Sequence, residues 1–127
     1  MRYPIFVISA VIAIASPVMA HHSATMFNHD KILPLEGTVK NWQWINPHSW
    51  LELATSDGKG GEIDQGFEVG SPNTLFRNGW RYHSFKPGDH VKITFMPRLD
   101  GKPGGMLYTA EPQGSTQYLS WLPKGTK

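Results

Sequence analysis

Apolar and polar positions alternate over several short segments of the chain, and this pattern predicts β-strands. The alternation is clearest in residues 90–95 (HVKITF), where Val91, Ile93 and Phe95 share one face. Turn-forming stretches rich in Gly, Pro and Asp separate this segment from its neighbours. The same pattern predicts four further strands, at residues 35–45, 48–55, 62–69 and 106–111.

The alternation slips by one residue within the first predicted strand. Gly37 and Val39 lie on one face, whereas Trp42 and Trp44 follow in the opposite phase. A β-bulge produces such a slip and bends the strand. A bent first strand favours a small barrel, since a barrel must curl its strands to close.

Residues 71–80 (SPNTLFRNGW) predict a short helix between the third and fourth strands. Ser71 suits the N-cap, and Gly79 suits the C-terminal cap. Leu75 and Phe76 are expected to pack inward from this helix.

Three strands, a short helix and two strands follow one another in the order of an OB-fold, a five-stranded Greek-key barrel. The prediction is therefore an all-β, OB-fold-like barrel, and a small β-sandwich is the alternative. The expected organisation is a signal peptide at 1–20, an N-terminal arm at 21–34, the barrel at 35–112 and a tail at 113–127.

The first twenty residues have the layout of a secretory signal peptide. Arg2 provides a positive start, residues 6–15 (FVISAVIAIA) are apolar, and Val18–Met19–Ala20 is a small-x-small cleavage site. The apolar run is short for a bilayer span, although an uncleaved membrane anchor is the alternative. We expect a secreted protein that has no stable membrane insertion after cleavage.

Composition narrows the classes of function. The chain has no cysteine, which excludes disulfides, thiolate zinc sites and thiol chemistry. Arg2 is one of 12 Lys and Arg residues, so the mature chain would be nearly balanced against 10 Asp and Glu. No basic cluster is present, and a nucleic-acid partner is not expected.

Cleavage after Ala20 would make His21 the first residue of the mature chain. Its amine and its ring could then chelate a metal, and a second imidazole would complete a histidine brace, a ligand set that suits Cu(II). The amine, an amide and the His22 ring offer another geometry for Cu(II), with Met26 and His29 as further donors on the arm. The alternative is a solvated, disordered end.

His48 follows Asn46–Pro47 at the start of the second predicted strand and is the candidate for the second imidazole of the brace. The alternative is a hydrogen-bonded corner residue. His83 and His90 flank a Lys-Pro-Gly-Asp turn, and we expect both in solvent.

Three tryptophans, Trp42, Trp44 and Trp50, come close together in the sequence. They could form a stacking platform for a ligand, as on some OB-folds, but core packing is expected for at least two of them. Glu52 and Glu68 are a possible acid and base across strands. No Ser-His-Asp grouping, phosphate-binding loop or dinucleotide motif is present, so an enzyme is the weaker class.

Four blocks carry a family resemblance: HHS at 21–23, NPHSW at 46–50, GSPNTLFRNGW at 70–80 and FKPGDHV at 85–91. With these blocks the chain resembles an uncharacterised family of short secreted bacterial proteins with a domain of unknown function. The resemblance implies a periplasmic single-domain β protein and brings no established activity.

Three functions are therefore carried forward. The first is a periplasmic metal-binding module, with copper favoured and His21, His22 and His48 as ligands. The second is a non-catalytic module that binds a ligand or a protein partner through an aromatic face. The third is a redox or hydrolytic enzyme built on the same metal.

Overall fold

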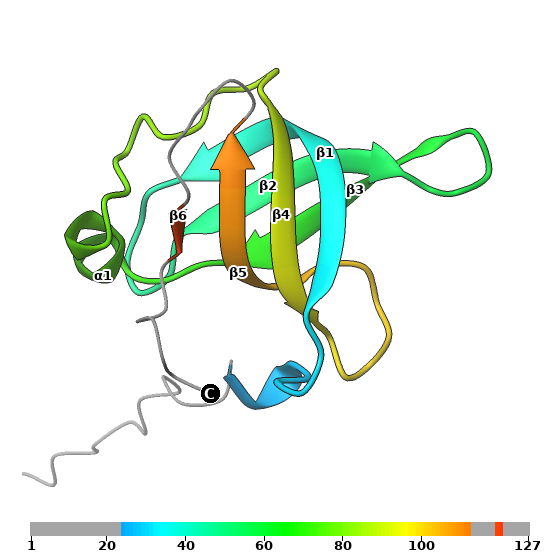
Figure 1. The fold of residues 1–127 in the computed structure, drawn as a ribbon, viewed down its shortest axis with the longest axis horizontal. Helices are drawn as coiled ribbons and strands as arrows, with labels where there is room; N and C mark the ends of the chain where they lie inside the picture. Colours follow the sequence, from blue (N-terminus) through cyan, green and yellow to red (C-terminus); the bar gives the residue numbers. More distant parts are fainter. Residues whose placement is uncertain (1–23, 113–118, 121–127) are drawn as a thin grey trace, which may run out of the picture.

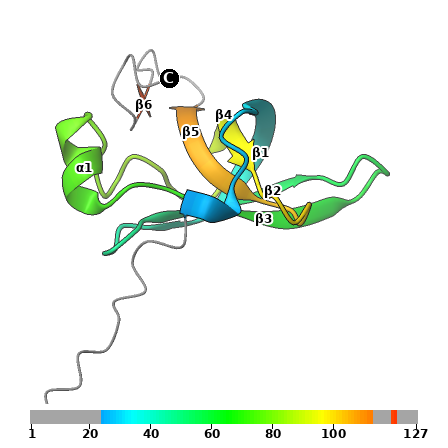
Figure 2. The same cartoon turned by 90° about the horizontal axis from the view of Figure 1, so that it is seen from below.

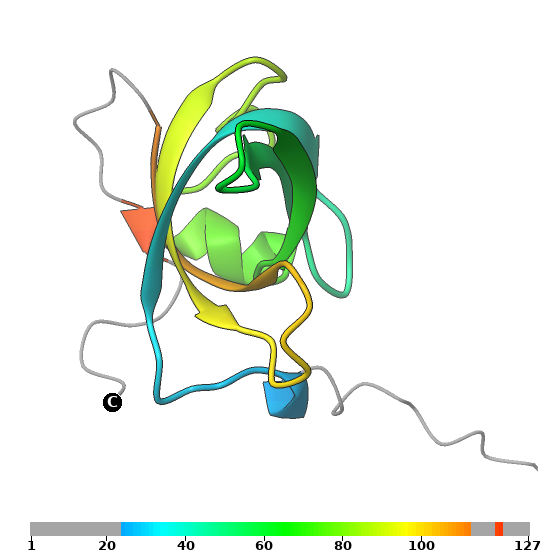
Figure 3. The same cartoon turned by 90° about the vertical axis from the view of Figure 1, so that its right-hand side faces the viewer.

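The computed structural model describes residues 24–112 and 119–120, which form a closed β-barrel with one short helix (Figure 1). The strands are β1 (Leu33–Gln43), β2 (Trp50–Ser56), β3 (Glu62–Glu68), β4 (His90–Pro97), β5 (Gly105–Pro112) and β6 (Leu119–Ser120). They follow the order β3-β2-β1-β4-β5-β6, and β3 also pairs with β5. This extra pairing closes strands β1 to β5 into a ring, so the OB-fold-like barrel is confirmed over the β-sandwich (Figure 3).

The predicted bulge in the first strand is present. The β1–β2 register shifts between Val39 and Asn41, which leaves Lys40 as the extra residue. Val39 is buried in the barrel before the bulge, and Trp42 packs against the same core after it. The bulge therefore explains how both phases of this strand contribute to one interior.

The barrel interior is filled by large apolar side chains from all five strands. Each one contributes about 1.5–3 kcal/mol to folding when it leaves water completely. The buried strand residues of this core are Val39, Leu51, Leu53, Phe67, Val91, Ile93, Phe95, Leu107 and Ala110.

Helix α1 (Pro72–Arg77) covers one end of the barrel (Figure 3). The Ser71 hydroxyl accepts a hydrogen bond from the Thr74 amide at 3.4 Å, which confirms the predicted N-cap. Leu75 is fully buried, but Phe76 is 58% exposed, so the inward packing expected for Phe76 is wrong. A helix this short buries only a narrow stripe, and the Arg81 guanidinium lies over the Phe76 ring instead.

The N-terminal arm is docked onto the outside of the barrel by Phe27, which is 4% exposed. A single 3-10 turn (η1, Ala24–Met26) precedes it and lies below the barrel (Figure 2). Phe27 forms a small apolar cluster with Met96 and Met106, against which Tyr108 packs. Backbone hydrogen bonds from Asn28 to Pro97 and from Leu99 to Met26 reinforce this docking, which the sequence did not predict.

Two glycines allow β5 to pass close to its neighbours where the barrel closes. A Cβ on Gly104 would collide with the carbonyl oxygen of Gly66, and one on Gly105 with that of Met96. Gly104 also has a φ of +97°. Its amide donates a hydrogen bond to the Gln65 side chain at 2.9 Å, which ties the loop before β5 to β3.

This crowding predicts different effects for two glycine substitutions. Gly101 also has a positive φ, +73°, but a Cβ there would meet open space. Gly104→Ala should therefore lower the free energy of unfolding by about 1–3 kcal/mol more than Gly101→Ala, because only Gly104→Ala adds a backbone collision. Urea unfolding of both variants measures the difference, and equal losses would show that the closure does not depend on this contact.

Candidate functional site

The candidate site begins at the corner between β1 and β2, where His48 follows a cis Asn46–Pro47 peptide. The Ser49 amide donates to the Gly70 carbonyl at 3.0 Å, and the Val69 amide donates to the Ser49 carbonyl at 2.8 Å. These bonds continue the β2–β3 ladder by one step. They hold the backbone next to His48 against the end of β3.

The His48 ring contacts the carboxylate of Glu68, the last residue of β3. Its Nδ1 lies 2.5 Å from the Glu68 Oε1, and the two side chains are 36% and 7% exposed. A carboxylate as buried as Glu68 is costly without a partner, so the imidazole stabilises it in this position. This contact agrees with the alternative of a hydrogen-bonded corner residue, and the role of His48 as a metal ligand stays a prediction.

Sequence reasoning missed the His48–Glu68 contact. Glu68 lies opposite Trp50 in the β2–β3 register, and alternation puts His48 on the same face as Trp50. The two residues are 20 positions apart, and only the pairing of β2 with β3 shows that they meet. In the sequence, the only indication of this contact was the predicted alternation within 48–55, which places His48 on the same face as Trp50.

The pair fixes the chemistry of the His48 ring. An ionised carboxylate only accepts hydrogen bonds, so the proton of the neutral ring lies on Nδ1 and the lone pair lies on Nε2. Such a ring can bind a metal or accept a proton through Nε2. The hydroxyl of the neighbouring Ser49 is buried, so it is not accessible as a nucleophile for this pair.

The β3–β5 pairing places the docked arm close to this pair. Glu68 lies opposite Met106 across the parallel pairing. Met106 belongs to the apolar cluster that holds Phe27. The arm is therefore anchored on the strand that adjoins Glu68.

The other predicted metal ligands lie on or before the arm. His21 and His22 are outside the described residues, and Met26 and His29 are exposed. Within residues 24–112 and 119–120 there is no group of three or more His, Cys, Asp or Glu side chains placed to hold a metal ion. Residues outside these ranges would have to complete any site of that kind around His48.

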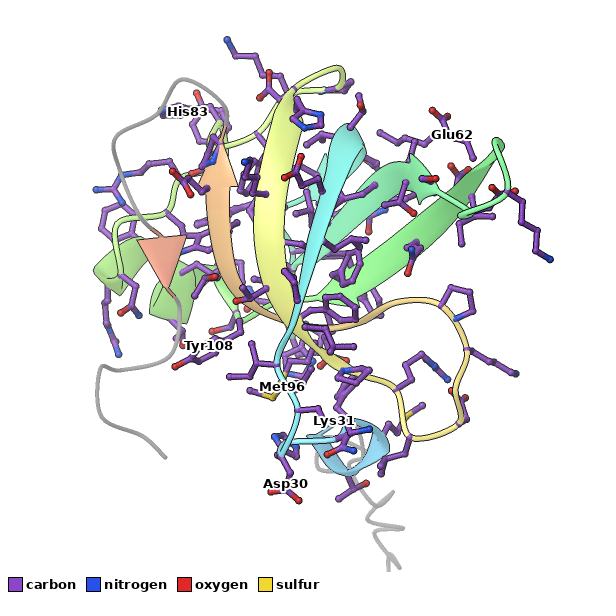
Figure 4. The ribbon with its side chains drawn as sticks, turned by 45° about the vertical axis from the view of Figure 1, so that its right-hand side comes forward. Asp30, Lys31, Glu62, His83, Met96 and Tyr108 are labelled. Carbon is purple, nitrogen blue, oxygen red and sulfur yellow. The ribbon has the colours of Figure 1, made fainter. Side chains whose placement is uncertain are left out.

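The two remaining histidines lie elsewhere. His83 is exposed, as expected, and lies at the opposite end of the barrel from Asp30 and Lys31 of the arm (Figure 4). His90 is partly exposed and contacts Glu36 at 3.4 Å. Hydrogen bonds from Lys92 and His90 hold the pKa of Glu36 below its usual value.

The three candidate tryptophans have different environments. Trp42 and Trp44 are partly buried against the core, which confirms the prediction that at least two would pack there. Trp42 contacts Trp44, Trp80 and Phe85, with ring centroids 5.2–5.9 Å apart. The buried Trp80 completes this group and was not predicted as part of it.

Trp50 instead lies on the outer face of the sheet and is 39% exposed. It borders a shallow hollow of about 300 Å³ across β1, β2 and β3. The hollow is lined by Asn41, Gln43, Trp50, Leu51, Glu52, Asp64 and Gly66. Glu68, opposite Trp50 in the register, connects this face to the His48 corner.

Residues 10–108 match a family described as a family of unknown function (DUF6152). The chain belongs to this family. The match spans the His48 corner, Glu68 and α1, and it confirms the resemblance to a domain of unknown function. No curated protein matches the chain. In the described part of the chain, no helix has the length and apolar character needed to cross a membrane.

The burial of Glu68 predicts a measurable coupling to His48. In a double-mutant cycle of His48→Ala and Glu68→Gln, urea unfolding should give a coupling free energy of about 1–2 kcal/mol. The exposed Lys40–Asp64 pair, at 2.6 Å, is the matched control and should give a smaller coupling in a cycle of Lys40→Met and Asp64→Asn, because solvent screens it. A smaller coupling for His48–Glu68 than for the control would contradict this account.

Proposed function

We propose that this protein is a periplasmic metal-binding module for which Cu(II) is the favoured ion. His48 supplies one ligand through Nε2. His21, once it is the first residue of the mature chain, supplies its amine and its ring. The pairing of His48 Nδ1 with the buried Glu68 carboxylate is the observation that carries this proposal.

The pairing supports a ligand role because histidines that bind metals usually donate their other ring N–H to a carboxylate or carbonyl. That hydrogen bond sets the tautomer, orients the ring and makes the free nitrogen a better donor. The amine and two imidazoles would form a set of three nitrogen ligands, and tetragonal nitrogen coordination favours Cu(II). His22 provides the alternative set, through the amine and the intervening amide.

The docking of Phe27 supports the proposal because it limits how far the preceding residues can extend from the barrel. Phe27 is held on the strand that adjoins Glu68. An extended chain spans at most about 3.3–3.6 Å per residue, so a first residue at His21 lies within roughly 20 Å of Phe27. The proposal requires that this reach brings the amine of His21 to the ring of His48.

The arm offers two further donors of different character. Met26 is exposed and has a soft thioether, and His29 brings another imidazole. Thioether and imidazole ligands together suit Cu(I) as well as Cu(II). These residues support a role in holding copper in either oxidation state, and they are secondary to His48.

Copper titration of the mature protein, with its first residue verified by intact mass, tests the proposal. We expect one Cu(II) to bind per chain in competition with a chelator. His48→Ala should weaken binding by at least about tenfold, and Glu68→Gln by about 10–100-fold through the lost hydrogen bond. An added glycine before His21 should abolish the three-nitrogen signature in electron paramagnetic resonance.

His83→Ala is the control for this titration, because His83 is exposed and lies at the opposite end of the barrel from Asp30 and Lys31 of the arm (Figure 4). It should bind copper as the unchanged protein does. Equal affinities for the unchanged protein, His48→Ala and the glycine-extended chain would show that the metal is not held at this corner.

A further inference from the structure

The outer face of β1, β2 and β3 presents an aligned set of side chains that lie outside the barrel core. The register places Gln43 opposite Trp50 in one row. The next row has Asn41 opposite Glu52, and Glu52 in turn opposite Gly66. These residues line the hollow of about 300 Å³ described above, which extends from β1 across β2 to β3.

Trp50 is the aromatic platform of this hollow. A Cβ on Gly66 would lie 3.6 Å from the six-membered ring of Trp50, so the indole lies across the glycine on β3. The barrel core already contains Trp42, Trp44 and Trp80, and Trp50 contributes nothing to it. An indole that packs over a glycine and is 39% exposed can stack with a ligand at little entropic cost.

The polar groups around Trp50 are available to a ligand. Within the described residues, the side chains of Asn41, Gln43 and Glu52 make no hydrogen bond, whereas Asp64 is engaged by Lys40 at 2.6 Å. Two amides and a carboxylate together donate and accept hydrogen bonds. A ligand with several hydroxyl groups can satisfy both kinds of partner.

The charge of the hollow narrows the class of ligand. Its lining contains Glu52 and Asp64 and no Lys, Arg or His, and Lys40 at its margin is paired with Asp64. A phosphate or a nucleic acid would meet carboxylates without a free cation, which disfavours binding. Apart from Trp50 and Leu51, the hollow has few apolar side chains in its lining, which disfavours a lipid or another purely apolar ligand.

We propose that the hollow binds one neutral sugar ring of a glycan, with the apolar face of the ring stacked on Trp50. Its hydroxyl groups hydrogen-bond to Asn41, Gln43 and Glu52. A shallow site on the open face of three strands suits a chain-like ligand, and OB-folds use this face for oligosaccharides as well as oligonucleotides. This inference stands independently of the metal proposal, because His48 does not line the hollow.

The test is a titration of metal-free protein with a panel of neutral oligosaccharides of glucose, N-acetylglucosamine, mannose and galactose. Tryptophan fluorescence and calorimetry report binding. At least one oligosaccharide should bind in the micromolar to millimolar range. Trp50→Ala should weaken that binding by about tenfold or more, and Trp50→Phe should weaken it less because a ring remains.

Three matched variants sharpen the experiment. Gln43→Ala removes a hydrogen-bonding group without touching the core and should also weaken binding. Tyr82→Ala removes an exposed aromatic ring outside the hollow and should leave binding unchanged. His48→Ala should also bind sugar unchanged, which separates this result from the outcome of the copper titration.

Several results would overturn the inference. One is the absence of binding to every sugar in the panel at millimolar concentration. Another is sugar binding that Trp50→Ala leaves unchanged while circular dichroism shows a folded barrel. A third is Trp50-dependent binding of choline or of a short oligonucleotide without any sugar binding, which would assign the hollow to a cationic or nucleic-acid ligand.

Discussion

The parallel pairing of β3 with β5 is the contact on which both the barrel and the candidate site depend. It joins Phe67 and Glu68 to Gly105 and Met106 and so closes the ring of five strands. Phe67 then faces the core while Glu68 faces outward, since neighbouring residues on a strand point to opposite sides. The β3–β5 pairing therefore closes the interior and positions the Glu68 carboxylate that contacts His48. It also places Glu68 beside β5, the strand whose Met106 packs against Phe27 of the arm.

The aromatic residues lie in two different environments, inside the barrel and on its outer face. The interior and the barrel end near α1 are filled by Trp42, Trp44, Trp80 and Phe85, whose rings meet largely edge to face. Trp50 remains outside, across Gly66, where no larger residue is needed to fill space. Gly66 is thus the position on β3 over which the exposed indole lies.

Local patterns predicted most of the fold, because each depends on residues close together in the chain. The strand alternation, the bulge before Trp42 and the Ser71 cap all agree with the structure. Phe76 was misplaced because a helical pattern does not reveal how narrow a stripe a six-residue helix can bury. Phe27 was missed because a lone aromatic in an irregular arm has no period to reveal what it will pack against.

The sequence by itself determined the order of the elements, the chemical types of the candidate ligands and the absence of thiol chemistry. These features can be read from the sequence because composition and local periodicity do not depend on how distant segments pair. Only the tertiary structure decided that Glu68 pairs with His48, that the arm docks beside that pair and that Trp50 lies outside the core. These facts depend on which strands pair and in what register, and a shift of one residue would turn each side chain to the other face.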